Sequence, residues 1–218
     1  MKITLANEVV IKRVTVFSTY LLLIWGLYRL FIKLPDEVEE LVIKPILWLG
    51  PLAFILQKER QGLASVGIGL KNLFPSIYFV LGLGAIFVIE AVIINFVKHG
   101  GVSFGANIGN QAFLAAIGLS FATAVSEEIS FRGYIFNRLW AVTRNEWLAN
   151  IITTTVWVAI HIPVVIFVWK YSFSAAAVYL LVTALFGIGS AFIFARTGNV
   201  FSSILLHVLW EWPIILFR

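Results

Sequence analysis

Seven long blocks of apolar residues divide this chain, and they limit its possible folds more than any other feature. An apolar stretch of about 18 residues or more is typical of a helix that crosses a membrane. The predicted spans are 14–32, 41–56, 73–97, 111–142, 146–169, 172–195 and 199–217. The sequence therefore predicts an all-α, polytopic transmembrane helix bundle of about seven spans.

The composition and the short loops agree with this prediction. Hydrophobic residues make up 61% of the 218 residues and charged residues only 12%, whereas soluble domains carry about 25% charged residues. No linker rich in Ser, Pro or Gly and no internal repeat interrupts the chain. The first apolar run is too long for the core of a signal peptide, so we interpret it as a retained helix. We predict one integral membrane domain over residues 1–218.

Lysines and arginines in the loops predict the orientation of the bundle. With the N-terminus in the cytoplasm, nine of them fall on the cytoplasmic side and five on the opposite side. The nine are Lys2, Lys12, Arg13, Lys58, Arg60, Lys71, Arg138, Arg144 and Arg196; the five are Lys33, Lys44, Lys98, Lys170 and Arg218. Topology and contact with anionic membrane lipids account for the net charge of +5, so no nucleic-acid partner is expected. We expect a multi-pass protein of the cell membrane with a cytoplasmic N-terminus.

Aromatic and small residues are interpreted structurally. Six aromatic residues lie near predicted span ends, where such side chains favour the membrane interface: Trp25, Tyr28, Trp48, Trp147, Trp169 and Tyr171. Small residues such as Gly187, Gly189 and Ser190 favour close packing between helices in lipid. Neither group is therefore expected to form a ligand site.

The stretch "SEEISFRGYIF", residues 126–136, places three ionisable side chains in a predicted span. Each of Glu127, Glu128 and Arg132 would cost about 2.5–3.5 kcal/mol at the centre of a lipid-facing helix. They must therefore lie near the cytoplasmic end of that helix or face a protein-lined interior. Glu128 and Arg132 are four residues apart, so we expect an ion pair between them, with Glu127 left without that partner.

Two histidines also lie in predicted spans. His161 occurs in "WVAIHIP" and His207 in "LLHVLWEW", where Glu211 follows four residues later on the same helical face. A straight helix beginning near residue 146 would carry His161 about 22 Å along its axis. Because the glutamate pair is expected nearer the cytoplasmic surface, that helix must begin in the cytoplasm, tilt or break.

Several hydrolytic chemistries do not fit the chain. The only aspartate is Asp36, in a predicted loop, so two membrane aspartates are absent, and the H-E-x-x-H motif of zinc proteases is absent as well. Ser120, Ser126 and Ser130 have no G-x-S-x-G context. The chain has no cysteine, which excludes thiolate nucleophiles and Cys-ligated zinc. Two hydrolytic mechanisms are left: water activated by a glutamate, and a zinc site formed by Glu and His.

Three motifs together resemble the CPBP family of intramembrane proteases. They are Glu127-Glu128-x-x-x-Arg132, Trp157-x-x-x-His161 and His207-x-x-x-Glu211, in the order found in that family and within residues 111–217. The family includes the type II CAAX prenyl endopeptidases and relatives linked to bacteriocin processing or self-immunity. The resemblance implies a catalytic core in the last four spans, open toward the cytoplasmic side.

The resemblance also implies a role for each motif residue. Glu127, assisted by His161, would activate the attacking water, and His207 with its partner four residues later would stabilise the oxyanion. Glu128 and Arg132 would hold the site together. The substrate implied is a peptide or membrane-protein segment, possibly lipid-modified. No metal cofactor is implied, although two histidines and a glutamate would suffice for a catalytic zinc ion.

The chain departs from the family pattern at two positions, and one of them keeps other functions open. Trp157 stands where the family commonly has Phe, and it still packs as an aromatic residue. The position four residues after the second histidine is usually Asn or Asp, whereas this chain has Glu211. An ionised carboxylate accepts hydrogen bonds but cannot donate one to an oxyanion. A non-catalytic immunity or scaffold protein is therefore one alternative. An ion-coupled transporter that uses Glu90, the glutamate pair and the histidines as a relay is another.

Overall fold

A computed structural model describes residues 6–101 and 113–217, and every regular element in those two ranges is a helix. The α-helices are α1 (Asn7–Phe31), α2 (Asp36–Val38), α3 (Lys44–Glu59), α4 (Leu73–His99), α5 (Phe113–Glu128), α6 (Asn137–Thr143), α7 (Glu146–Pro163), α8 (Phe173–Thr197) and α9 (Val200–Phe217). Three π-helical segments, η1 (Glu39–Ile43), η3 (Ile129–Phe136) and η4 (Val164–Val168), and a 3₁₀ turn, η2 (Leu63–Val66), join them. The predicted all-α class is confirmed for this part of the chain.

Five helical stretches are long and apolar enough to cross a membrane, judged by length and composition. They are Asn7–Phe31, Leu73–Val97, Leu114–Thr143, Glu146–Val168 and Phe173–Thr197. They correspond to five of the seven predicted spans; residues 111–112 of the fourth lie outside the described residues. The segments 41–56 and 199–217 fall on α3 and α9, which have 16 and 18 residues, fewer than the roughly 20 that a full crossing needs. The count of seven stays a prediction.

The outer surface of the bundle is apolar, as a lipid environment requires. Large exposed side chains include Phe74, Tyr78 and Leu81 on α4, and only 22% of the most apolar window of that helix is buried. In water such a surface would be an aggregation liability, but in lipid it costs nothing.

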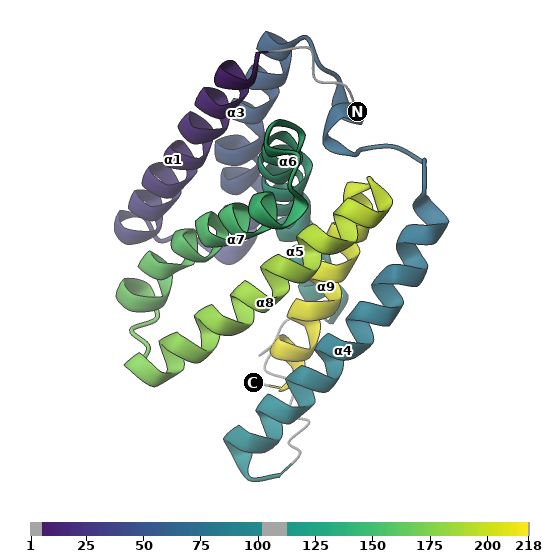
Figure 1. The fold of residues 1–218 in the computed structure, drawn as a ribbon. Helices are drawn as coiled ribbons and strands as arrows, with labels where there is room; N and C mark the ends of the chain where they lie inside the picture. The colour runs from purple at the N-terminus through teal and green to yellow at the C-terminus, as the bar shows by residue number, and fades with distance from the viewer. Residues whose placement is uncertain (1–5, 102–112, 218) are drawn as a thin grey trace.

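Helix α9 packs against α4, α5 and α8, whereas α1 packs against α6 and α7 (Figure 1). The helices α1 and α3 lie at one edge of the bundle and α4 at the opposite edge (Figure 1). Helix α3 also contacts α5. The N-terminal part of the chain therefore packs, through α3, against α5, the helix that carries the glutamate pair.

Segments predicted to be cytoplasmic gather at one end of the bundle. A guanidinium nitrogen of Arg13 lies 3.7 Å from Glu59 at the end of α3, and the side chain of Asn199 donates to the carbonyl of Lys71 at 2.8 Å. The left-handed Gly198 (φ 63°) ends α8 at this same end of the bundle. The side of the membrane that this end faces stays a prediction. Lys2 and Arg218, which entered the loop count, lie outside the described residues.

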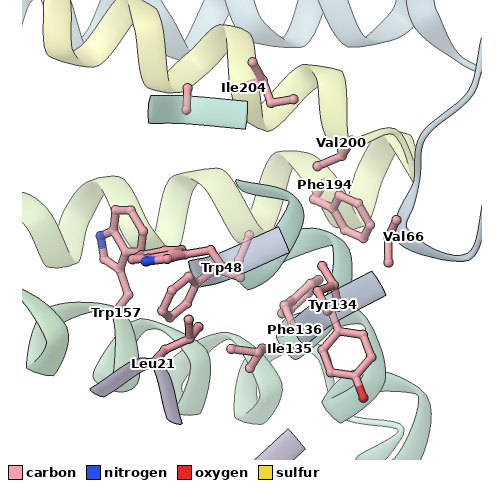
Figure 2. Packing of buried hydrophobic residues seen from close by; sticks show 14 of the residues in the cluster. Leu21, Trp48, Val66, Tyr134, Ile135, Phe136, Trp157, Phe194, Val200 and Ile204 are labelled. Atoms are coloured by element: carbon pink, nitrogen blue, oxygen red, sulfur yellow. The ribbon is translucent and has the colours of Figure 1, made fainter. Parts of the chain in front are cut away.

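Aromatic rings fill the core where α1, α3, η3 and α7 meet. Trp48 packs edge-on against Trp25 at 5.6 Å between ring centroids and tilted against Phe131 at 5.8 Å, and Phe131 packs edge-on against Trp157 at 5.0 Å. Figure 2 shows Trp48 and Trp157 within this core. The prediction that Trp25 and Trp48 lie in an interfacial belt is wrong: they are 8% and 1% exposed. Their rings bury more apolar area against other aromatic groups than at the interface.

A buried ion pair fixes α3 to α6 away from the glutamate pair. Arg138 donates to Oε2 of Glu59 through Nε at 3.0 Å and Nη2 at 2.9 Å. Its Nη1 and Nη2 also donate to the carbonyl and hydroxyl oxygens of Ser65, each at 3.1 Å, and the Tyr134 hydroxyl donates to Glu59 at 2.9 Å. The partners satisfy both charges, as burial of such a pair requires.

Candidate active site

Polar side chains from several helices meet in the interior of the bundle around Glu128. Helix α5 carries Glu127 and Glu128, while α7 carries His161, and α9 carries His207 and Glu211. Arg132 lies in the π-helical segment η3, and wide helical turns of this kind are frequent at functional sites. All six predicted site residues are therefore in the described part of the chain.

The carboxylate of Glu128 accepts hydrogen bonds from three side chains of this cluster. Its Oε1 accepts from Nη1 of Arg132 at 2.9 Å and from Nδ1 of His207 at 2.8 Å, and its Oε2 accepts from the hydroxyl of Ser190 at 2.7 Å. Its side chain is completely buried. The predicted pair between Glu128 and Arg132 forms, and it ties α5 and η3 to α8 and α9.

The guanidinium group of Arg132 is also completely buried. Its Nη2 donates to the carbonyl of Gly187 at 3.3 Å, and its Cζ lies 4.5 Å from the ring centroid of Trp157. A planar, weakly hydrated guanidinium can stack on an aromatic ring and pair with a carboxylate at once. Gly187 lets α8 approach closely, because a Cβ atom there would lie 2.9 Å from a methyl carbon of Thr154.

The contact with Glu128 also sets the tautomer and direction of His207. A carboxylate only accepts hydrogen bonds, so the Nδ1 atom carries a proton. The other ring nitrogen, Nε2, lies 4.0 Å from Oε2 of Glu127. This distance is too long for a direct hydrogen bond. Nε2 of His207 and Oε2 of Glu127 are therefore separated by a gap.

Glu127 has an ionic partner that was not predicted. The ammonium group of Lys44, at the start of α3, lies 2.8 Å from Oε1 of Glu127. The expectation that Glu127 is the unpaired carboxylate is therefore wrong, and Lys44 is not in a loop. Lys44 also pairs with Glu40 one turn earlier, and Glu40 accepts from the hydroxyl of Thr123 on α5 at 2.7 Å.

His161 lies beside this cluster, and its orientation is set by its own helix. Its Nδ1 donates to the carbonyl of Trp157 at 2.7 Å, which leaves Nε2 as the acceptor in the neutral ring. The ring of Trp157 packs against both histidines, with its centroid 4.7 Å from that of His161 and 5.8 Å from that of His207.

Glu211 contacts α5 at a different point. One of its carboxylate oxygens accepts from the hydroxyl of Ser120 at 2.5 Å. Ser120 lies seven residues before Glu127, two helical turns along the same face of α5. The Glu211 side chain therefore joins α9 to α5 on the side of His207 away from Glu128.

Glu127 and His161 lie at similar distances, counted along their helices, from the turn that joins the two helical stretches. Glu127 is 16 residues before Thr143, the end of its helical stretch, and His161 is 15 residues after Glu146, the start of the next. Asn145 caps α7 by accepting from the backbone of Leu148 at 3.0 Å, so the helix begins directly after the turn. The glutamate pair thus lies in the middle of a 30-residue stretch and not near its end. The depth of the site in the membrane stays a prediction.

Two contacts of the site were missed because they join distant parts of the sequence. Lys44 was counted as a loop lysine, and Ser190 was interpreted as a packing residue only. In the sequence, a lysine four residues after Glu40 in an apolar run was the available signal for Lys44. Ser190 had no comparable signal, because serine is common at helix contacts in lipid.

Ligands for a metal ion do not converge in the described residues. Within 6–101 and 113–217, no group of three or more His, Asp or Glu side chains has a metal-binding arrangement. The closest set, formed by Glu127, Glu128 and His207, is occupied by hydrogen bonds to Lys44, Arg132 and Ser190. Zinc dependence is therefore a question for the chelation experiment described below.

Together, an all-helical bundle with lipid-compatible helices and an ionisable cluster in its interior defines a multi-pass membrane protein with a buried polar site. Residues 109–213 match the family model described as type II CAAX prenyl endopeptidase Rce1-like. This segment, which holds all six predicted site residues, is similar to that protease family, and the predicted resemblance is confirmed. No curated protein and no solved structure matched the chain.

Proposed function

We propose that the chain is an intramembrane endopeptidase that hydrolyses peptide bonds with a water molecule activated by Glu127. The observation that carries this proposal is the facing pair of Glu127 and His207, whose Oε2 and Nε2 atoms lie 4.0 Å apart. Each group is held through its other polar atom: Oε1 of Glu127 is bound by Lys44, and Nδ1 of His207 is bound by Glu128. Such preorganised groups around a gap are what hydrolysis needs.

The attacking water would lie in this gap. One water molecule bridges two polar atoms that are too far apart for a direct hydrogen bond. Glu127 takes a proton from the water, and the oxygen of the water attacks the carbonyl carbon of the scissile bond. His161, on the neighbouring helix, assists this transfer through its Nε2 atom.

His207 is suited to the negative charge that develops on the carbonyl oxygen. In its imidazolium form, both ring nitrogens donate: Nδ1 to Glu128 and Nε2 to the oxyanion. A preorganised donor of this kind is worth roughly 3–4 kcal/mol of transition-state stabilisation. When the tetrahedral intermediate collapses, the C–N bond breaks and the proton held by Glu127 passes to the leaving amine nitrogen.

The substrate class follows from the place of the site. Because the cluster is buried at mid-depth of helices that are long enough to cross a membrane, the substrates we propose are peptide segments of membrane-associated or lipid-modified proteins. We also propose that the site opens toward the cytoplasm and that the N-terminus is cytoplasmic, which the excess of basic residues at that end of the bundle favours.

A non-catalytic immunity or scaffold protein is the second candidate, and Glu211 favours it. Where the family usually has Asn or Asp, this residue is one methylene longer than Asp and, unlike Asn, has no amide donor, and its carboxylate is occupied by the Ser120 hydroxyl at 2.5 Å. An ionised Glu211 would repel an oxyanion near His207 instead of donating to it.

A mass-spectrometric cleavage screen tests the proposal. Purified wild type and Glu127→Gln are incubated with prenylated and unmodified peptides and with membrane-protein tails, with and without a chelator. We expect cleavage by the wild type alone, unaffected by the chelator. Activity lost on chelation and restored by zinc would contradict the metal-free mechanism. A folded wild type that cuts no member of the library would contradict the proteolytic function and favour the scaffold.

A further inference from the structure

The N-terminal half of the chain contributes a charge directly to the proposed base. Lys44 lies outside residues 109–213, the segment matched by the family model, yet its ammonium group is 2.8 Å from Oε1 of Glu127. This contact joins residues 83 positions apart. The family's catalytic motifs therefore do not include every group that touches the proposed base.

The surroundings of Lys44 are built for a buried cation. The residue is 3% exposed, and its Nζ atom lies 5.1 Å and 5.8 Å from the ring centroids of Trp25 and Trp48. An ammonium group can stay charged in such a place only with anionic or aromatic partners. Glu40 and Glu127 supply two carboxylates, and Glu40 is in turn held to α5 by Thr123.

The backbone around Lys44 keeps the ammonium group in place. The π-helical segment η1 ends directly before Lys44, and Pro45 follows it in the first turn of α3. Because α3 contacts α5 and η3, the start of α3 cannot move away without breaking several contacts. Lys44 is thus a fixed group rather than a flexible surface lysine.

The contact uses one oxygen of Glu127 and leaves the other available. Lys44 holds Oε1, whereas Oε2 is the oxygen 4.0 Å from Nε2 of His207. We propose that Lys44 is the positioning residue of the proposed base: its ammonium group holds Oε1 of Glu127 so that Oε2 points into the gap and takes the proton from the attacking water. This inference rests on the proposed function.

A role in binding an anionic group of the substrate fits the structure less well. Lys44 is buried, and two carboxylates already take two of the three donors of its ammonium group. A substrate anion would have to reach the third donor inside the core, beside the rings of Trp25 and Trp48. Positioning and substrate binding predict different kinetics, because loss of a positioning residue lowers kcat and loss of a binding residue raises KM.

The experiment compares Lys44→Met, Lys44→Ala and, as a matched control, Lys58→Met on the exposed end of the same helix. A displacement of the base by about 1 Å costs on the order of 10²-fold in rate. We expect Lys44→Met to lose about this much in kcat with KM little changed, and Lys58→Met to match the wild type. Ethylammonium chloride should partly restore Lys44→Ala, and tetramethylammonium chloride at the same ionic strength should not.

Two results would overturn the proposal while leaving Glu127 as the base. One is a wild-type kcat for folded Lys44→Met when Glu127→Gln is inactive. The other is an effect of Lys44→Met on KM alone, which would assign Lys44 to substrate binding.

A double-mutant cycle measured by thermal unfolding tests the contact between Lys44 and Glu127 without an activity assay. If Lys44 acts through Glu127, the double variant Lys44→Met, Glu127→Gln has a Tm no lower than that of Lys44→Met alone. Additive Tm shifts would overturn the proposal. If the wild type cleaves nothing, the proposed function fails, and this cycle still decides whether Lys44 holds Glu127.

Discussion

Glu128 on α5 and His207 on α9 are joined by a hydrogen bond of 2.8 Å between Oε1 and Nδ1. The bond links two residues that are 79 positions apart in the sequence. It also directs Nε2 of His207 toward Glu127. Because Glu128 also binds Arg132 and Ser190, a change in this one carboxylate should alter both the stability of the bundle and the geometry of the site.

Replacement of Glu128 by Gln should destabilise the protein strongly. The change leaves the guanidinium group of Arg132 buried without an anionic partner, and breaking such a pair costs about 3–5 kcal/mol. Thermal unfolding in detergent measures the loss. Glu146→Gln serves as the control, since it breaks the more exposed pair with Arg196 and should cost at most about 1 kcal/mol. Equal effects of the two variants would contradict the account.

Ser190→Ala should cost stability without changing the charge of the site. The variant removes one hydrogen bond to a buried carboxylate, which is worth about 1.5–3 kcal/mol. We also expect slower cleavage, because Glu128, which orients His207, loses one of the two other contacts that hold it. Ser174→Ala, at an exposed position near the start of α8, is the matched control. A Ser190→Ala variant as stable and as active as the control would show that the hydroxyl does not hold Glu128.

Glu211→Asn should raise the cleavage rate. It replaces a carboxylate near His207 by an amide that can donate a hydrogen bond, and one donor to an oxyanion is worth about 10²–10³-fold in kcat where the geometry is ideal. The variant also releases the hydroxyl of Ser120, so Ser120→Ala separates the two effects. Steady-state kinetics on the peptide found in the cleavage screen measure the change. A lower rate in Glu211→Asn would mean that the carboxylate itself is needed, for example to orient His207.

Glu59→Gln should affect stability alone. Glu59 and Arg138 are completely buried, so loss of one partner should cost about 3–5 kcal/mol. The pair contacts Ser65 in η2, Tyr134 in η3 and Arg13 in α1, and none of these is one of the six residues of the proposed site. Cleavage per folded molecule should therefore match the wild type when it is measured well below the Tm. A large drop in kcat at a temperature where the variant is folded would couple this pair to the site.

The helical class and the local part of the site could be predicted because both follow from short-range patterns. Apolar runs identify spanning helices, and the spacing of Glu128 and Arg132 places both side chains on one helical face. The contact between Glu127 and Lys44 depends on how α3 packs against α5, across 83 residues, and no local pattern pairs such distant segments.

Two misinterpretations had the same physical cause. Trp25 and Trp48 were assigned to the membrane interface, and Lys44 to a loop, because each lies near the end of an apolar run. In the structure the rings pack in the core, and Lys44 is 5.1 Å from the ring of Trp25. Position within a run does not tell an interfacial residue from one that faces a neighbouring helix, since that difference depends on rotation about the helix axis.

Cleavage by Glu127→Gln tests the central claim most directly. Gln keeps the size of the side chain but cannot accept a proton from water, and Glu90→Gln on α4 is the matched control for a lost membrane carboxylate. The account predicts that folded Glu127→Gln loses cleavage of the wild-type substrate by at least about 10²-fold, while Glu90→Gln keeps it. Cleavage at the wild-type rate by Glu127→Gln would contradict the claim that this carboxylate activates the water.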